Sequence, residues 1–277
     1  MSFEICELNI DDKPYSFEVQ GDFDWGDPIN TFIIENNIIS RTNWIDEGYK
    51  LVNNFFESKN EFLLLKEEVY KNIINAMNIN DIAFDVKNFK LENYHKIIKE
   101  DNQHQKIVKI IRNLTEKDFE LDINKILSRA EDILKYKLTT YVKELKKVHI
   151  QIRISRPNSF DINPPHKDGY LNYWKNIINI WIPIAGCNQE SSLPILPNSH
   201  LWPENEIYRT KNKGAKINGL PYNVPCILKT SNGKMKMIRP NPEVGDAIFF
   251  TPFLIHGAGF NNSSYTRIGM ELRFPKF

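Results

Sequence analysis

The sequence is poor in cysteine and contains no cysteine pair. Its three cysteines lie far apart and form no CxxC motif: Cys6, Cys187 and Cys226. Thiolate zinc sites need closely spaced cysteines and small secreted domains need a dense set of disulfides, so both classes of protein are excluded. A reducing compartment is the simplest setting, and we expect the protein to be cytoplasmic.

An excess of charge of one sign is also lacking. The chain has 36 Lys and Arg against 35 Asp and Glu, which gives a formal net charge of +1 over 277 residues. No overall field attracts nucleic acid or an anionic membrane, so neither is expected as a partner. Apolar runs of signal-peptide or membrane-span length are absent as well, which favours a soluble, unprocessed protein.

Hydrophobic residues make up 41% of the chain, enough to bury a core, and neither a repeat nor a low-complexity linker divides it. Helical spacing dominates before residue 147. Ser58 and Glu61 have the spacing of a capping box at the start of a helix predicted over 58–77. A second amphipathic helix is predicted over 122–147. We therefore expect a helical N-terminal half.

After residue 147 the hydrophobic period changes to two. Residues 148–155 alternate apolar side chains with His149, Gln151 and Arg153, as in a strand with one face in a core and the other in a polar cavity. Further strands are predicted at 177–185, 193–196, 247–256 and 266–273. Several short strands without intervening helices favour an antiparallel sandwich or barrel.

Two short motifs could together bind a metal ion. His166 and Asp168 lie two residues apart, so both side chains point the same way in an extended segment. His256 ends the apolar run that begins at Phe249. Two histidines and a carboxylate on one side of an ion form the facial triad of non-haem Fe(II) oxygenases, which leaves room for a cosubstrate and dioxygen. The alternatives are a loop histidine at 166 and a core histidine at 256.

Arg267 adds a second kind of ligand-binding group. It lies eleven residues after His256, on a strand whose apolar positions are Ile268, Met270 and Leu272. This alternation buries one face of the strand and directs Arg267 to the other. A guanidinium group binds a carboxylate through two hydrogen bonds, so Arg267 is suited to the end of a dicarboxylate remote from the metal.

Several pieces of the sequence occur in the same order as in a known family. They are Gly48-Tyr-Lys-Leu-Val-Asn-Asn-Phe-Phe, His166-Lys-Asp168, Trp181-Ile-Pro-Ile, Leu193-Pro-Ile-Leu-Pro-Asn-Ser-His200, Pro242-Glu-Val-Gly-Asp-Ala-Ile-Phe-Phe, His256-Gly and Arg267. Together they resemble the iron(II)- and 2-oxoglutarate-dependent dioxygenases of the phytanoyl-CoA dioxygenase-like group. The resemblance covers about residues 45–275 and assigns no role to residues 1–44 or to much of 79–120.

The resemblance implies an α+β chain with a double-stranded β-helix core, the jelly-roll of cupin-like enzymes. Residues 1–44 would be an N-terminal extension, and residues 45–277 would form a single oxygenase domain. Within that domain, helical support would occupy about 45–147, and the jelly-roll core about 148–275.

The family's site is carried over residue by residue. His166, Asp168 and His256 would bind Fe(II), 2-oxoglutarate would chelate the iron, and Arg267 would hold the far carboxylate. With O2 the reaction would release succinate and CO2 and hydroxylate a small-molecule substrate. The presence of Asp168 argues against the halogenase variant, in which a small residue leaves room for halide.

Further residues receive expectations from the same resemblance. Arg153 and Trp181 are expected at the 2-oxoglutarate pocket, and Gln151, Tyr170 and His200 are candidates for substrate contact. The alternatives are an outer strand face for Gln151 and Arg153, a core position for Trp181 and a structural role for His200.

The sequence departs from the family where a hydroxyl residue often assists Arg267. The corresponding positions here are Gly269, Gly257 and Ala258, so other donors are needed, with Thr251, Tyr265 and Thr266 or a group on the first core strand as candidates. His95 and His104 are expected on solvated helix faces, and His149 is given no functional role.

Residues 207–240 contain eight basic residues and no acidic one, and we interpret them as a long insertion between strands. Such a basic lid would suit an anionic metabolite, whereas the alternative is a solvated loop that compensates acidic patches elsewhere. Competing functions are a catalytically silent jelly-roll binding protein and a cupin-type metalloenzyme with different chemistry. Arg267 counts against the latter. The oligomeric state and the substrate stay open.

Overall fold

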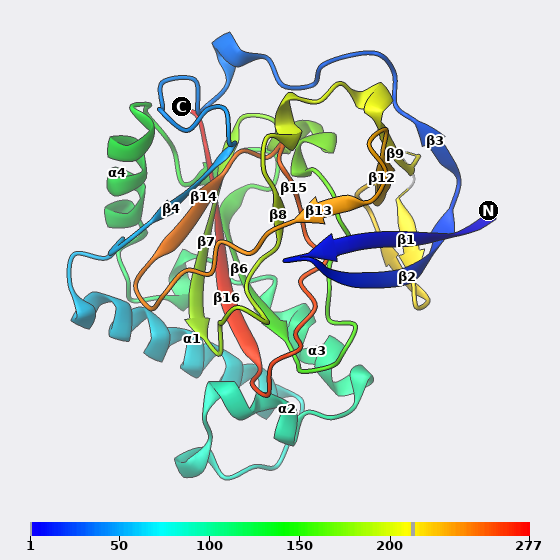
Figure 1. Ribbon diagram of the computed structural model, residues 1–277. Coiled ribbons are helices and arrows are strands. Elements are labelled where there is room, and N and C mark those ends of the chain that lie inside the picture. The colour runs from blue at the N-terminus through cyan, green and yellow to red at the C-terminus, as the bar shows by residue number, and fades with distance from the viewer. Residues whose placement is uncertain (1, 212–213) are drawn as a thin grey trace.

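The N-terminal segment contributes strands to a sheet. The computed structural model describes residues 2–211 and 214–277 and begins with a hairpin of β1 (Ser2–Ile10) and β2 (Lys13–Gly21) (Figure 1). β1 pairs in parallel with β13 (Met235–Met237), which lies more than 200 residues later in the chain. Residues 2–44 are therefore joined to the C-terminal half. The expectation of a helical N-terminal half is wrong for this segment, which forms strands.

The central layer is a six-stranded antiparallel sheet in the order β4-β14-β7-β16-β6-β5. Its strands are β4 (Tyr49–Val52), β5 (Tyr141–Val142), β6 (Lys147–Ser155), β7 (Ile177–Ala185), β14 (Ala247–Phe250) and β16 (Arg267–Pro275). The predicted strands at 148–155, 177–185 and 266–273 are confirmed. The predicted strand at 247–256 is interrupted by a turn before β15 (Ile255–His256), so that prediction holds only in part.

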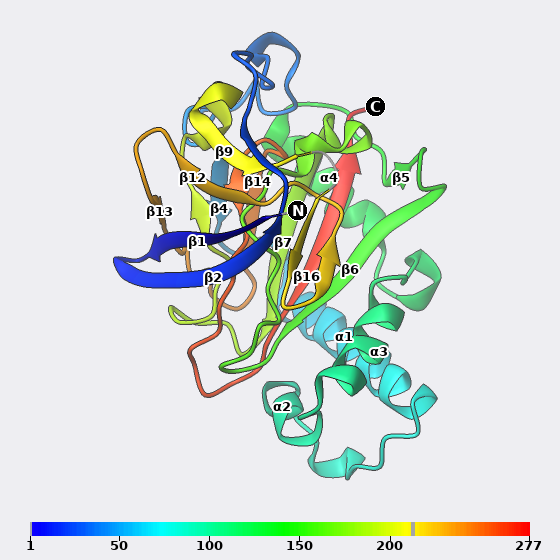
Figure 2. The same ribbon diagram turned by 90° about the vertical axis from the view of Figure 1, so that its right-hand side faces the viewer.

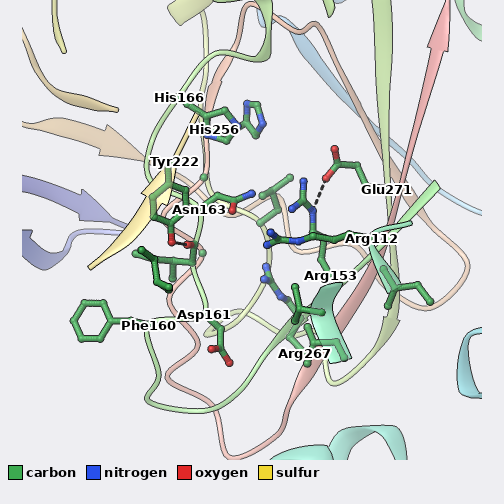
Figure 3. Close-up of a pocket in the computed structure, with 18 of the residues that line it drawn as sticks. Arg112, Arg153, Phe160, Asp161, Asn163, His166, Tyr222, His256, Arg267 and Glu271 are labelled. Carbon is green, nitrogen blue, oxygen red and sulfur yellow. Dashed lines mark hydrogen bonds and ion pairs between the residues drawn. The ribbon is translucent and has the colours of Figure 1, made fainter. Parts of the chain in front are cut away.

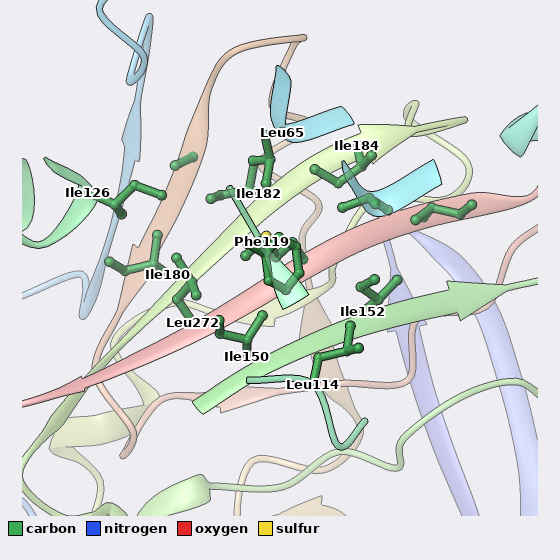
Figure 4. Packing of buried hydrophobic residues seen from close by; sticks show 14 of the residues in the cluster. Leu65, Leu114, Phe119, Ile126, Ile150, Ile152, Ile180, Ile182, Ile184 and Leu272 are labelled. Atoms are coloured by element: carbon green, nitrogen blue, oxygen red, sulfur yellow. The ribbon is translucent and has the colours of Figure 1, made fainter. Parts of the chain in front are cut away.

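Helices cover one face of this sheet. They are α1 (Lys59–Ile79), α2 (Tyr94–Ile97), α3 (Asp101–Ile111) and α4 (Ile123–Leu134). Figure 4 shows Leu65 of α1 and Ile126 of α4 against Ile150, Ile180 and Leu272 of the three central strands. The even-numbered residues of β6, β7 and β16 thus form the core, and the odd-numbered residues face the opposite side.

A second layer of strands lies across that opposite side. It contains a five-stranded sheet β11-β10-β2-β1-β13, a three-stranded sheet β12-β9-β3 and the pair β15-β8. The remaining strands are β3 (Phe23–Trp25), β8 (Ile195–Leu196), β9 (Ile207–Thr210), β10 (Ala215–Ile217), β11 (Leu220–Tyr222) and β12 (Ile227–Thr230). In Figure 2 the β1–β2 hairpin and helices α1 and α3 lie on opposite sides of the central sheet. The fold is therefore mixed α/β, rich in strands.

Two sequence predictions about local structure are only partly right. The helix at 58–77 is confirmed as α1, and Ser58 Oγ accepts the Glu61 N–H at 3.2 Å. The Glu61 carboxylate accepts the N–H of Glu57 and not that of Ser58, so the capping box is incomplete. The helix predicted over 122–147 is wrong beyond Leu134, because Lys135 adopts a left-handed conformation (φ 58°) that ends α4.

The interpretation of residues 207–240 as an insertion loop is also wrong. This segment supplies β9 to β13, and its cations meet acidic partners near the N-terminus: Lys211 contacts Asp24 at 3.5 Å and Lys234 contacts Glu7 at 3.1 Å. Lys213 lies outside the described residues. The segment therefore compensates nearby acidic charge, as the alternative interpretation held. Within the described ranges, no helix is long and apolar enough to span a membrane.

Candidate functional site

The structure brings the two distant histidines of the predicted triad into direct backbone contact. His166 and His256 form an isolated antiparallel bridge, with N–H···O distances of 3.0 and 3.1 Å. Gly257 follows with φ 115°, where a Cβ would approach the Pro164 carbonyl oxygen to 2.5 Å. Only glycine fits this close approach of two chain segments, which explains the residue after His256.

Both imidazoles present the same nitrogen to Asp168. His166 Nδ1 lies 2.7 Å from the Pro164 carbonyl oxygen and His256 Nδ1 lies 3.0 Å from that of Leu254. Since a carbonyl only accepts, each Nδ1 carries a proton, which leaves Nε2 as the nitrogen available to a metal. The Nε2 atoms lie 3.6 and 3.5 Å from the Asp168 carboxylate oxygens.

This donor set suits a divalent cation. The ligand atoms of His166, Asp168 and His256 all lie within 4.8 Å of one another, and all three residues are buried. Burial and the neighbouring His166 lower the pKa of His256 to about 4. Burial would raise the pKa of Asp168, but Arg273 and His256 hold it well below its usual value. Metal binding requires neutral imidazole and ionised carboxylate, and these shifts favour both forms in His256 and Asp168.

Two side chains from the central sheet orient the Asp168 carboxylate. Arg273 Nη2 donates to one oxygen at 2.9 Å and Asn179 Nδ2 donates to the other at 2.9 Å. Arg273 Nε also donates to Asn179 Oδ1 at 3.0 Å, which fixes the amide. Such outer hydrogen bonds fix the direction in which a ligating carboxylate faces its metal.

A buried ion pair also anchors the segment that carries His166 and Asp168. Lys167 is fully buried between the two ligands, and its Nζ donates to Glu204 at 2.9 Å. Tyr170 donates to the other oxygen of Glu204 at 3.0 Å, and Arg209 lies 3.4 Å from it. Burial would raise the pKa of Glu204, but Lys167, Tyr170 and Arg209 together hold it below its usual value.

A cavity of about 270 Å³ adjoins the triad and contains Arg267. In Figure 3 the guanidinium groups of Arg112, Arg153 and Arg267 point into this space, and His166 and His256 face them across it. Arg267 is buried, and among the described residues its Nε has no hydrogen-bond partner. Burial lowers its pKa to about 10, so the group remains a cation at neutral pH. A buried cation with an unused donor is suited to an anionic ligand.

Trp181 lines the same cavity and explains the glycine at 269. A Cβ at Gly269 would lie 2.8 Å from three atoms of the Trp181 ring, and the ring centroid lies 5.8 Å from the Arg267 guanidinium carbon. A hydroxyl residue at 269 would collide with this ring. Two of the residues considered as alternative donors to the ligand of Arg267 are poorly placed for that role. Thr266 Oγ1 already lies 2.8 Å from His95 Nδ1, and Tyr265 is exposed. Arg153, on the first core strand, does line the cavity and pairs with Glu271 at 2.9 Å.

A second cavity, of about 480 Å³, also adjoins the triad and shares His166 and Arg153 with the first. Its lining includes three odd-numbered residues of β6, His149, Gln151 and Arg153, together with His166 and Asp168. His149 Nε2 and Gln151 Oε1 are buried, and neither has a hydrogen-bond partner among the described residues. The predicted polar face of this strand therefore lies beside the triad and not on an outer surface.

Two predicted site residues lie away from both cavities. Tyr170 bonds Glu204, and His200 Nε2 lies 2.7 Å from the Ile45 carbonyl oxygen, with its ring against Phe32. Both make contacts within the fold, and neither lines either cavity.

The expectation that His104 is solvated is wrong. His104 is buried, its Nδ1 lies 3.1 Å from the Tyr94 hydroxyl, and its Nε2 lies 3.3 Å from Asp161. His95, also expected on a solvated face, is half-buried against Thr266.

Sequence reasoning missed four residues at the site. Asn179 and Arg273 support Asp168, and His149 and Arg112 line cavities. The alternation of β6 places His149 on the face of Gln151 and Arg153, so its position could have been found. Arg112 gives no comparable signal, because it lies at the end of a helix in a segment that the motifs do not cover.

The sequence model of the family described as phytanoyl-CoA dioxygenase (PhyH) matches residues 46–269. No curated protein matches the sequence.

Three similar solved structures are distant from the chain. EctD from S. alaskensis, with 2-oxoglutarate and 5-hydroxyectoine, is 14% identical with a TM-score of 0.47, over 93% of this chain and 84% of that one. AviO1 from Streptomyces viridochromogenes Tue57 is 13% identical with a TM-score of 0.49, over 91% and 96%. The non-heme alpha ketoglutarate dependent epimerase SnoN from nogalamycin biosynthesis is 12% identical with a TM-score of 0.46, over 88% and 82%.

Proposed function

The chain belongs to the phytanoyl-CoA dioxygenase family, and from this premise we propose that it is an Fe(II)- and 2-oxoglutarate-dependent oxygenase that hydroxylates a small polar or anionic metabolite. The observation that carries the proposal is the adjacency of two groups. The ligand atoms of His166, Asp168 and His256 lie within 4.8 Å of one another, and the adjoining cavity contains the buried cation Arg267. A 2-oxoglutarate dianion bridging the two would satisfy both.

Each residue has a defined task in this proposal. His166, Asp168 and His256 would hold Fe(II), which with 2-oxoglutarate and O2 supplies C–H oxidation with release of succinate and CO2. Arg267 would bind the carboxylate of 2-oxoglutarate remote from the metal, and Trp181 would form the wall beside it. Arg153, held by Glu271, would face the cosubstrate from the first core strand.

The second cavity would hold the substrate. Gln151 projects into it from β6, and its unpartnered Oε1 would accept a hydrogen bond from a substrate hydroxyl or amine. Together the central sheet and the strand layer facing it would form the double-stranded β-helix that the sequence resemblance implies.

Succinate formation tests the proposal. Protein supplied with Fe(II), 2-oxoglutarate and O2 should release succinate, and the His166→Ala and Asp168→Gly variants should not. The triad lies beside cavities and not in the packed core, so both variants should remain folded by circular dichroism. Succinate formation that is unchanged in either variant would exclude the assigned metal site.

A further inference from the structure

The second cavity carries more positive charge than its protein partners neutralise. Its lining contains the cations Arg112, Lys147, Arg153 and Arg273, but Asp168 is its only carboxylate among the described residues. Arg273 is paired with Asp168 and Glu271, and Arg153 with Glu271. In the described part of the chain, no carboxylate lies within 4.0 Å of Arg112 or Lys147. A metal ion at the triad would add further positive charge.

Arg112 lies where the two cavities meet. It caps the C-terminal end of α3, and it lines both cavities together with Asn163, Tyr222 and His166. Its side chain is exposed because it projects into this open space. The smaller cavity already has a buried cation in Arg267, which leaves Arg112 available to a second ligand.

One buried histidine in the lining of the larger cavity has a ring nitrogen without a hydrogen-bond partner in the described part of the chain. His149 is 4% exposed, and its Nε2 is without a hydrogen bond among the described residues. Its ring is fixed edge-on against Trp174, with centroids 4.8 Å apart. Burying a polar atom without a partner is unfavourable, so a ligand that bonds this nitrogen would recover the loss.

We propose that the larger cavity binds a substrate with a carboxylate or phosphate group, that Arg112 binds this anionic group, and that His149 Nε2 hydrogen-bonds the substrate beside it. Lys147, on the same strand as His149, adds a second positive charge. This inference rests on the proposed function, because it takes the larger cavity as the substrate cavity. It also gives α3, which the sequence motifs leave without a role, a task in substrate selection.

Calorimetric titration with small anions tests the subsite. The protein, saturated with Fe(II) and 2-oxoglutarate under argon so that Arg267 is occupied, is titrated with phenyl phosphate and benzoate, and with the uncharged phenol and benzamide. At least one anion should bind roughly tenfold to hundredfold more tightly than its uncharged counterpart, as expected for charge-assisted hydrogen bonds. The preferred anion identifies the substrate group as phosphate or carboxylate.

Matched variants on one helix locate the effect. Arg112→Gln should abolish the preference for the anion, and Arg112→Lys should retain part of it. Lys109→Gln makes the same charge change on α3 outside both cavities, and it should leave the preference unchanged. Wild-type protein without a preference, or an equal loss in Lys109→Gln, would overturn the subsite.

Binding of 2-oxoglutarate separates this inference from the proposed function. Arg112→Gln should form the Fe(II)–2-oxoglutarate chelate as wild type does, which also shows that the variant is folded. If Arg112→Gln instead loses 2-oxoglutarate binding, Arg112 is a cosubstrate ligand and the subsite is refuted. If wild-type protein forms no chelate, the proposed function fails, while the anion preference can still be measured in the metal-free chain.

Discussion

Replacing Glu204 by glutamine should destabilise the protein strongly, although Glu204 is not one of the three proposed metal ligands. The carboxylate is 2% exposed and is the only anion in contact with the fully buried Lys167 among the described residues. Glu204→Gln keeps the shape but leaves the ammonium group buried without a counter-charge. Breaking one side of a buried ion pair costs about 3–5 kcal/mol, so the free energy of unfolding should fall by that amount.

Urea unfolding monitored by circular dichroism provides the measurement. Glu206→Gln, in the same short helical turn but without an ion pair to any described residue, is the matched control and should change the free energy of unfolding by less than about 0.5 kcal/mol. A Lys167→Met/Glu204→Leu double variant should recover much of the loss, because it removes both charges. Fe(II) binding should weaken in Glu204→Gln, since Lys167 lies between two ligands. A loss below about 1 kcal/mol in Glu204→Gln would refute the reasoning.

Three further predictions concern the cavities and the buried histidine. Arg267→Ala should leave Fe(II) binding nearly intact and weaken 2-oxoglutarate at least roughly tenfold in a calorimetric titration; equal cosubstrate affinity would contradict its assignment. Gly269→Ser should lower the free energy of unfolding by about 1–3 kcal/mol and also weaken 2-oxoglutarate, because its Cβ would meet the Trp181 ring at 2.8 Å; unchanged values of both would show that the ring can move. Burial lowers the pKa of His104 to about 4 from 6.5, so only the unfolded chain binds this proton in that interval. His104 should therefore contribute a fall of up to about 3 kcal/mol in the free energy of unfolding as the pH drops from 6.5 to 4, and His104→Asn should flatten the curve obtained from urea unfolding by that amount; an unaltered slope would contradict the assignment.

The strands that carry the site could be predicted because their two faces differ chemically. In β6 and β16 a branched or long apolar residue alternates with a polar or small one, and this period of two fixes both the strand and the direction of Arg153 and Arg267. Lys167 is likewise extended, so the side chains of His166 and Asp168 on either side of it lie close together.

Other features could not be predicted from the sequence, because they depend on contacts between distant segments. The apolar positions of 135–147 fit a helix, but Lys135 turns the chain and Val142 enters a strand beside β6. The cations of 207–240 look like a lid in the sequence, yet Lys211 and Lys234 find acidic partners from the N-terminal strands. No local pattern encodes those pairings. Arg112 reaches the cavity by the docking of α3, which likewise has no local signal.

The measurement that tests the central claim most directly is an anaerobic titration of the metal-free protein with Fe(II) and then 2-oxoglutarate, followed by visible absorption. The proposed triad predicts a charge-transfer band of the chelate in wild-type protein and none in His166→Ala. Arg267→Ala should show the band only at higher 2-oxoglutarate concentration. A folded wild-type protein without the band, or a band of equal strength in His166→Ala, would contradict the assignment of His166, Asp168 and His256 as the iron site.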